Sequence, residues 1–222
     1  MNKIFIACDN TNISKTKEII IKTNNPKLKV GYKFGLEFLH SKIGRKFISK
    51  LKNKIIFADL KLHDIPNTCV SAIKAIKDLK INYLTIHISS GLKALSASKK
   101  VCGGIKLVGV TILTSLDNKA LKEIGFNKDV KKLVMHQAKL ARKANLDAIV
   151  CSAQEAKIVK KVFKKEIITP GIRLNSKKND QKRTLTPKQA FKNGSDWLVI
   201  GRPITKGNIK KNINRLVDHL KQ

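Results

Sequence analysis

Three charged residues between positions 59 and 64 form the densest candidate for chemistry in this sequence. Asp59, Lys61 and Asp64 follow the apolar run IIFA and precede the segment IPNT. In an extended segment, residues 59 and 61 point to the same side, which places a carboxylate beside an ammonium. Buried charges need partners, so two carboxylates require a second cation, which Lys33 can supply. The alternative is an ordinary surface mixture of Asp and Lys.

A second candidate is an anion site formed by the segments PGIR and IGRP. Gly171 and Gly201 allow the backbone to approach a ligand closely, and main-chain amides can then hold an anion. Arg202 adds a guanidinium with two parallel donors. Arg173, Arg183 and Arg202 are three of the six arginines in the chain, and all lie in or between these motifs. Two tight turns with incidental arginines are the alternative interpretation.

The elements that must position these residues follow a regular rhythm. Short apolar runs rich in Ile and Val alternate with longer amphipathic stretches, and continuous apolar runs are typical of parallel strands buried on both faces. The predicted strands are Lys3–Cys8, Leu28–Phe34, Ile55–Leu60, Tyr83–Ile88, Lys106–Leu113, Ala148–Cys151, Ile167–Thr169 and Trp197–Ile200. The predicted helices are Ser14–Thr23, Leu36–Leu51, Asn67–Leu79, Leu92–Lys100, Val130–Ala144, Ala153–Phe163, Lys188–Asn193 and Ile209–Lys221.

A strand followed by a helix, repeated eight times within 222 residues, is the pattern of a (β/α)8 TIM barrel. We therefore predict an α/β fold in which residues 1–222 form a single barrel domain. A doubly wound open sheet is the alternative, but the dinucleotide fingerprint GxGxxG is absent. Active sites of such barrels lie at the C-terminal ends of the strands. The predicted strands end at polar residues or glycine, namely Asp9, Lys33, Asp59, His87, Ser89, Thr114, Ser115, Ser152, Arg173, Gly201 and Arg202.

Net charge is the most unusual property of the composition. The chain has 47 basic and 15 acidic residues, a formal charge of +32, and 41 of the basic residues are lysine. Lys, Ile and Asn all have A/T-rich codons, so a genome-wide compositional bias explains their abundance together. Nucleic-acid surfaces favour Arg and aromatic residues, and aromatics are only 5% of this chain. We expect no nucleic-acid partner, and a non-enzymatic nucleic-acid-binding protein is the weaker alternative.

Two further features bear on cell location. No apolar run approaches the ~18 residues of a membrane span, and the N-terminal run of apolar residues before Asp9 is too short for a signal peptide. The four cysteines, at 8, 69, 102 and 151, form no CxxC pair, which argues against zinc and redox motifs. We expect a cytoplasmic protein with reduced thiols and no membrane association.

Together, these motifs resemble the orotidine 5′-monophosphate decarboxylase family. The resemblance is carried by DLKLHDIPNT (59–68), VTILTS (110–115), VCSAQE (150–155), TPGIR (169–173), DQKRTLTP (180–187) and WLVIGRPIT (197–205), in this order over most of the chain. It implies decarboxylation of orotidine 5′-monophosphate to uridine 5′-monophosphate in pyrimidine biosynthesis, without a metal or cofactor. It also implies a homodimer whose subunits share their active sites.

The resemblance also implies roles for individual residues. Asp9 would bind the ribose, and Lys33 would pair with Asp59 and the ribose hydroxyls. Asp59 would face the substrate carboxylate, and Lys61 would donate the proton that replaces it. Asp64 would complete the catalytic charge array of the partner's site. The other implied substrate contacts are Thr68 in the partner's site, Thr114 and Ser115 near the pyrimidine, and Arg173, Gln181, Gly201 and Arg202 at the phosphate.

This sequence departs from the family pattern in two places. The second-strand lysine could be Lys29, which begins KVG, or Lys33, which begins KFGLEF. We choose Lys33, because it is followed by LE and lies nearer the C-terminal end of the strand. After His87 the chain reads HISSG, where the family often has two adjacent glycines. We interpret His63 as structural, because it faces away from Asp59 and Lys61 in a regular strand. A structural role is also favoured for His87, but its position at a strand end leaves an acid or base role as the alternative.

The nearest alternative function uses the same DxKxxD core. A sugar-phosphate decarboxylase or aldolase of this kind would use Mg²⁺ and an enediolate, and would require further carboxylates as ligands. Apart from Asp59 and Asp64, Asp9 is the acidic residue that we place at a strand end. The segments IPNT and DQxR favour the nucleotide enzyme.

Overall fold

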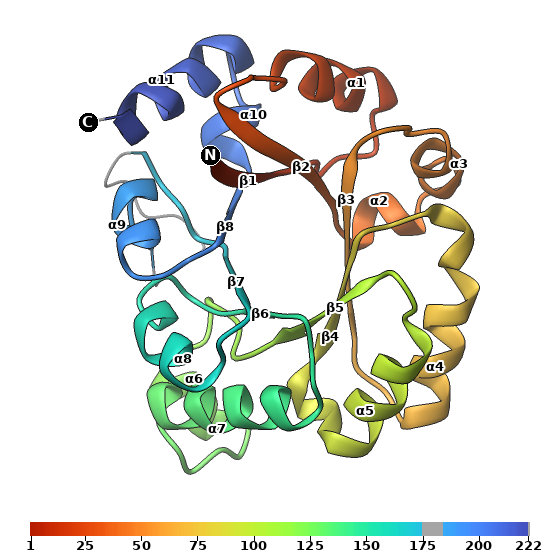
Figure 1. Ribbon diagram of the computed structural model, residues 1–222, viewed down its shortest axis with the longest axis vertical. Helices are drawn as coiled ribbons and strands as arrows, with labels where there is room; N and C mark the ends of the chain where they lie inside the picture. Colours follow the sequence, from red (N-terminus) through yellow and green to blue (C-terminus); the bar gives the residue numbers. More distant parts are fainter. Residues whose placement is uncertain (175–183, 222) are drawn as a thin grey trace.

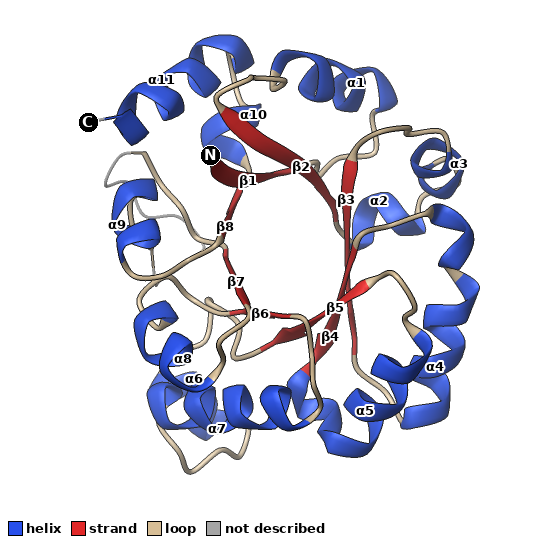
Figure 2. Cartoon of the chain, viewed as in Figure 1, coloured by secondary structure: helices blue, strands red, loops and turns tan. Residues whose placement is uncertain are grey.

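Eight parallel strands close into a barrel in this computed structural model, which describes residues 1–174 and 184–221. The strands pair in sequence order, and β1 pairs with β8 to close the ring. Their bounds are β1 Asn2–Ala7, β2 Leu28–Phe34, β3 Ile55–Leu62, β4 Tyr83–His87, β5 Lys106–Val110, β6 Ala148–Val150, β7 Glu166–Thr169 and β8 Trp197–Ile200. The predicted (β/α)8 barrel is confirmed, and Figures 1 and 2 show the helices arranged around the ring of strands.

The helices form the outer layer. Their bounds are α1 Ile13–Lys22, α2 Leu36–His40, α3 Gly44–Ser49, α4 Pro66–Ala75, α5 Gly91–Val101, α6 Asn118–Glu123, α7 Val130–Lys143, α8 Ala156–Val162, α9 Pro187–Lys192, α10 Arg202–Thr205 and α11 Ile209–Lys221. Short 3-10 turns cover Lys77–Leu79 and Ile88–Ser90. The apolar stripes of the helices pack on the outward side chains of the strands and form the larger hydrophobic core. Among the described helices, none combines the length and apolarity needed to cross a membrane.

One predicted helix needs correction, and two short helices were not predicted. The stretch Leu36–Leu51, predicted as one helix, is α2 followed by α3, because Ser41 leaves the helical conformation and its hydroxyl donates to the Phe38 carbonyl at 2.7 Å. The chain then turns back so closely that a Cβ on Gly44 would overlap the Phe38 oxygen. The sequence analysis also did not identify the short helices α6 and α10, which follow β5 and β8.

The interior of the barrel is filled by an aromatic layer. Phe5 stacks on Trp197 with ring centroids 4.1 Å apart, and it contacts Phe57 and Tyr83 edge-on or tilted. β2 contributes Gly31 at this level, because a Cβ there would lie 2.6 Å from the Phe5 ring. Since side chains alternate along each strand, residues two positions further on also point inward, above this layer. The aromatic layer is therefore the floor beneath the C-terminal mouth.

Below the aromatic layer, Glu166 closes the other end of the barrel. Its carboxylate accepts hydrogen bonds from Lys106 Nζ at 2.8 Å, the Tyr83 hydroxyl at 3.0 Å and Trp197 Nε1 at 3.3 Å. Lys3 Nζ lies 3.4 Å from the second carboxylate oxygen. The end of the barrel opposite the mouth is thus held by one carboxylate that joins four strands.

Candidate active site

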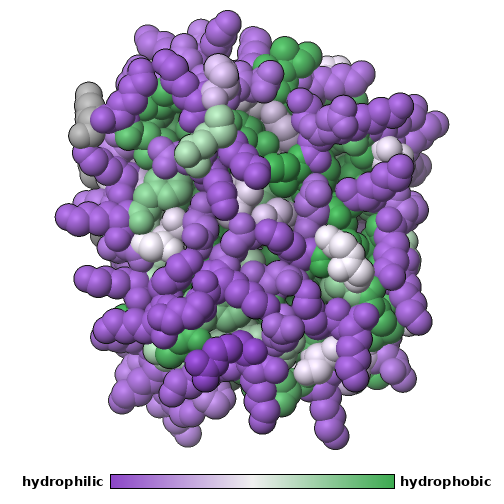
Figure 3. All heavy atoms as spheres, in the orientation of Figure 1, coloured by the Kyte–Doolittle hydropathy of each residue, from purple (hydrophilic) through white to green (hydrophobic). Residues whose placement is uncertain are grey.

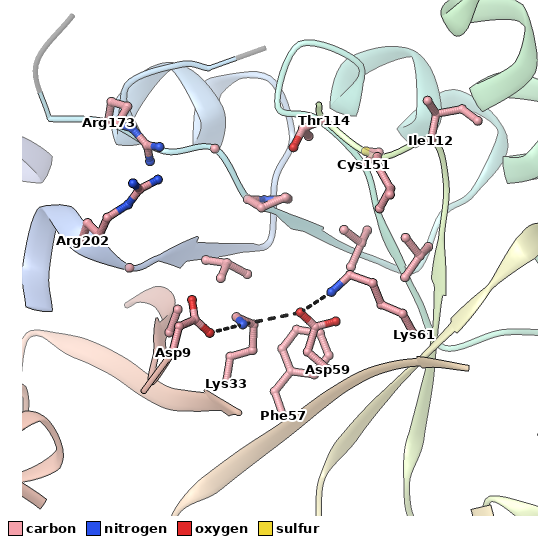
Figure 4. A pocket seen from close by; sticks show the side chains of 18 residues that line it. Asp9, Lys33, Phe57, Asp59, Lys61, Ile112, Thr114, Cys151, Arg173 and Arg202 are labelled. Atoms are coloured by element: carbon pink, nitrogen blue, oxygen red, sulfur yellow. Dashed lines mark hydrogen bonds and ion pairs between the residues drawn. The ribbon is translucent and has the colours of Figure 1, made fainter. Parts of the chain in front are cut away.

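A cavity of about 300 Å³ opens at the C-terminal ends of the strands (Figure 4). Its polar lining comes from β1, β2, β3, β5, β7 and β8, and it includes predicted site residues from each of them. Eight predicted residues line it, namely Asp9, Lys33, Asp59, Lys61, Thr114, Arg173, Gly201 and Arg202. The rest of the wall is largely apolar and consists of Ala7, Phe57, Val110, Ile112, Leu113, Val150, Cys151, Pro170, Gly171 and Val199.

Charges of alternating sign run across the floor of the cavity. Lys33 Nζ lies 2.8 Å from Asp9 Oδ1 and 3.5 Å from Asp59 Oδ2. The same Asp59 oxygen lies 2.9 Å from Lys61 Nζ. Figure 4 shows these four side chains as one row of contacts. We call Asp9, Lys33, Asp59 and Lys61 the charge array.

The two central members of the charge array are buried. Lys33 is 8% exposed and Asp59 9% exposed, so neither charge is solvated and each depends on its partners. Burial alone would raise the pKa of Asp59, but Lys33 and Lys61 outweigh it and hold that pKa below its usual value. Burial would lower the pKa of Lys33, but Asp59 and Asp9 outweigh it and raise that pKa. Both groups therefore stay charged at neutral pH.

Lys29, the other candidate for the second-strand lysine, lies apart from the array. It is exposed and pairs in register with Lys3, toward the opposite end of β2 from Lys33. Gly35, which follows Lys33 by two residues, leaves room for the array. A Cβ on Gly35 would lie 3.3 Å from Asp9 Oδ1 and 3.5 Å from Lys33 Nζ.

Lys61 reaches the array through an irregular backbone, not through the regular strand that the sequence suggested. Its φ is 50°, in the left-handed region that non-glycine residues rarely adopt. The pairing of β3 with β4 shifts between Ala58 and Leu62, so the strand bulges at the site. The contact between residues 59 and 61 was anticipated, but the bulge that aims Lys61 was not.

Thr85 is a site residue that the sequence analysis missed. It is fully buried in β4. Its hydroxyl donates to Asp59 Oδ1 at 3.1 Å and accepts the backbone N–H of Lys61 at 2.8 Å. One hydroxyl thus holds both the carboxylate and the bulged backbone. The signal in the sequence was a threonine inside the apolar run YLTIH, two residues before His87.

Two guanidinium groups face the cavity from the other side. Figure 4 shows Arg173, after β7, and Arg202, after β8, extending toward the same space. Two glycines belong to the same segments. Gly171 has a φ of 77°, and Gly201 lies so near Ala7 that a Cβ on it would be 3.4 Å from Ala7 Cβ. Two guanidinium groups beside glycine backbone can bind a phosphate dianion.

Three predicted site residues lie outside the cavity. Asp64 and Thr68 are exposed at the start of α4, and Asp64 Oδ1 accepts the backbone N–H of Ile65 at 2.7 Å. Ser115 is exposed beyond Thr114. Gln181 and Arg183 lie outside the described residues. Within this chain, the structure brings together the array and the arginines, but not Asp64, Thr68 or Ser115.

His63 and His87 form a pair at the edge of the mouth. Their ring centroids are 5.1 Å apart, and His63 Nε2 lies 3.3 Å from the Ser89 hydroxyl. Burial lowers the pKa of His87, and the neighbouring His63 and Lys61 lower it further. Neither ring lines the cavity. Within residues 1–174 and 184–221, no three His, Cys, Asp or Glu side chains form a cluster that could hold a metal ion.

Comparison with known proteins identifies relatives over almost the whole chain. Residues 2–213 match the model of the orotidine 5′-phosphate decarboxylase / HUMPS family. The orotidine 5′-phosphate decarboxylase of Wolbachia pipientis subsp. Culex pipiens is 46% identical over 94% of this chain and 93% of its own. That of Wolbachia sp. subsp. Brugia malayi is 46% identical, with 98% of each chain covered. The crystal structure of the Lactobacillus acidophilus orotidine 5′-phosphate decarboxylase superposes with a TM-score of 0.85 at 29% identity and covers 100% of both chains.

Proposed function

The chain belongs to the orotidine 5′-phosphate decarboxylase / HUMPS family, and we propose that its charge array carries out the reaction. The enzyme converts orotidine 5′-monophosphate to uridine 5′-monophosphate in pyrimidine biosynthesis. The observation that carries the proposed mechanism is the Lys33–Asp59–Lys61 row, in which a buried carboxylate lies between two ammonium groups at the mouth of the barrel.

The chemical problem is a carbanion without a neighbouring electron sink. When the bond from pyrimidine C6 to the carboxylate breaks, CO₂ leaves and the electron pair stays on C6. A cation already in place beside C6 stabilises that charge without reorganisation of solvent. Lys61 Nζ provides this cation and then donates its proton to C6, which yields uridine 5′-monophosphate and a neutral amine that regains a proton from water.

Asp59 and Lys33 position Lys61 and hold its charge. Asp59 accepts from Lys61 Nζ at 2.9 Å and is itself held by Lys33 and Thr85. We place the substrate carboxylate against Asp59, where repulsion between the two anions is relieved as CO₂ departs. We place the ribose beside Asp9 and Lys33 and the pyrimidine beside Thr114, all of which line the cavity.

Arg202, Arg173 and the amide of Gly201 bind the 5′-phosphate. This corner lies across the cavity from Asp59 and Lys61, so phosphate binding is remote from the reacting carbon. Binding energy gained there lowers the barrier when it orients the pyrimidine in the transition state. The sequence assigns Gln181 to the same phosphate, and this role stays a prediction.

We further propose that two subunits share each active site. Asp64 and Thr68 lie outside their own cavity but flank Ile65, which is 67% exposed. Two exposed polar residues beside the mouth that do not line their own cavity are placed to reach a second copy of the chain, which supports an isologous interface there. Asp64 and Thr68 would then reach the partner's array, and Ser115 lies at the same open end.

We also propose a cytoplasmic location, which the four buried free cysteines support.

The direct test is an absorbance assay of orotidine 5′-monophosphate with purified protein and a chelator. We expect full turnover with the chelator, because Lys61 supplies the cation that a metal would otherwise provide. Turnover that requires added Mg²⁺ would instead support the enediolate alternative. Lys61→Ala should abolish kcat, while binding of uridine 5′-monophosphate shows that the variant still folds.

The shared site is tested by mixing inactive Lys61→Ala and Asp64→Ala chains. Half of the dimers formed by random exchange are mixed, and each mixed dimer has one site with both native residues. About a quarter of native activity should return. If a tag on one variant shows that exchange has occurred and no activity returns, Asp64 acts within its own chain.

A further inference from the structure

A second cavity adjoins the phosphate corner of the active site. It has a volume of about 350 Å³ and shares Ala7, Asp9, Gly201 and Arg202 with the main cavity. Beyond this shared wall it is lined by Asn10, Lys15, Ile19, Thr205, Lys206 and Gly207. It lies between the start of α1 and the segment that joins α10 to α11, which are neighbours in Figure 1. A ligand that extends past the 5′-phosphate on this side enters this second cavity.

The charges in the second cavity suit an anion. Arg202, Lys15 and Lys206 contribute three cations. Lys15 already contacts Glu18 at 2.9 Å, whereas Lys206 is exposed and its ammonium has no carboxylate partner among the described residues. The acidic group at the boundary, Asp9, is paired with Lys33 at 2.8 Å. The lining thus has three cations and one carboxylate, Asp9, whose Oδ2 lies 4.0 Å from where a Cβ on Gly201 would be.

The passage between the two cavities is bounded by residues with little bulk. Gly201 lies in both linings, and even a Cβ there would come no closer than 3.4 Å to Ala7 Cβ. Gly207, on the outer side, has a φ of 73° and no atom within 4 Å of where its Cβ would be. Because neither position carries a side chain, no side chain from residue 201 or 207 stands between the two cavities or at the outer wall of the second.

We propose that the second cavity binds a further phosphoryl group, so that pyrimidine nucleoside 5′-diphosphates bind this enzyme as inhibitors. The nucleoside occupies the main cavity, the α-phosphate lies at Arg202 and Gly201, and the β-phosphate lies between Arg202 and Lys206. This inference rests on the proposed placement of the 5′-phosphate. Because C6 of such a nucleotide carries no carboxylate, the ligand is not turned over and competes with the substrate.

The test compares uridine 5′-diphosphate with uridine 5′-monophosphate by calorimetry on the native protein. We expect the diphosphate to bind the native enzyme at least as tightly as the monophosphate and to inhibit competitively. Lys206→Glu should raise the dissociation constant of the diphosphate relative to that of the monophosphate at least about tenfold, because it removes a cation and places an anion beside the β-phosphate. Lys29→Glu makes the same charge change at the opposite end of the barrel and should leave the ratio unchanged.

Either of two results overturns the inference. One is a native enzyme that binds the diphosphate more weakly than the monophosphate. The other is a ratio of diphosphate to monophosphate dissociation constants that rises no more in Lys206→Glu than in Lys29→Glu. Turnover of orotidine 5′-monophosphate and binding of uridine 5′-monophosphate are measured on the same samples. If these fail, the proposed function fails, whereas failure of the ratio alone removes only the second phosphate subsite.

Discussion

Lys61 carries its ammonium on a left-handed backbone with a φ of 50°, which costs a non-glycine residue about 1 kcal/mol. Glycine does not have this cost. We predict that Lys61→Gly and Lys61→Ala are both inactive, but that the glycine variant is more stable by about 1 kcal/mol. Denaturant unfolding of the two variants measures this difference directly, because both lack the same ion pair. Equal stabilities would show that the backbone at Lys61 is not strained.

Thr85 links the carboxylate and the backbone of the array through one hydroxyl. Thr85→Val keeps the shape of the side chain but leaves one Asp59 oxygen and the Lys61 N–H without this partner. Because lost hydrogen bonds to buried charged groups cost about 1.5–3 kcal/mol, we predict a fall in kcat of at least about tenfold. Thr85→Ser restores the hydroxyl and should recover most of the rate. A valine variant with native kcat would contradict the positioning role.

At this scale, the sequence predicts the charges better than their geometry. Asp59 and Lys61 are identifiable because charged residues directly after an apolar run need buried partners, and Lys33 is the nearby cation. The bulge at Lys61 depends on pairing with β4, which no local pattern records. Thr85 is hidden for the same reason, since a threonine in a strand is ordinary until its neighbour is a buried carboxylate.

Gly44 sets the geometry of an element, the turn from α2 into α3. A Cβ at this position would overlap the Phe38 carbonyl oxygen, which belongs to backbone and cannot rotate away. We predict that Gly44→Ala destabilises the fold by about 2 kcal/mol through overpacking. Gly104→Ala is the matched control, because nothing lies within 4 Å of its Cβ position. Similar unfolding free energies for the two variants would show that the turn adapts.

The elements themselves are largely predictable from the sequence, for different reasons. The strands are buried on both faces, so their apolar runs are continuous and stand out. Helix α7 has a full apolar stripe, and the predicted helix ends one residue from the observed end. The short helices α6 and α10 have too few turns to show periodicity. The break after His40, where Ser41 becomes extended and the chain then packs closely at Gly44, is not revealed by the amphipathic pattern of 36–51.

For the whole molecule, Glu166 links stability to pH. Burial would raise the pKa of Glu166, but hydrogen bonds from Lys106 and Tyr83 outweigh it and hold that pKa below the ordinary 4.5. A carboxylate with a lowered pKa contributes stability above 4.5, and this contribution disappears as the pH falls through the folded-state pKa. We predict that native protein exceeds Glu166→Gln in unfolding free energy at neutral pH and that the gap narrows below pH 4.5.

Glu123→Gln is the control for this prediction. Glu123 is exposed on α6 and makes the same change of net charge when replaced. The unfolding free energy of Glu123→Gln should differ little from that of native protein at any of the pH values measured. Urea unfolding at a series of pH values gives the unfolding free energy of each protein as a function of pH. A difference between native protein and Glu166→Gln that does not change with pH would show that Glu166 does not link stability to pH.

The pairing of β1 with β8 constrains how the chain can be made. The edge of β1 that faces β8 has no partner until residues 197–200 have left the ribosome. Helix α11, which packs on α1, is synthesised later still. Partly synthesised chains thus expose an apolar, unpaired strand edge throughout elongation, which is a template for association between nascent chains. The high positive charge of the chain, +32 over its full length, opposes such association by mutual repulsion.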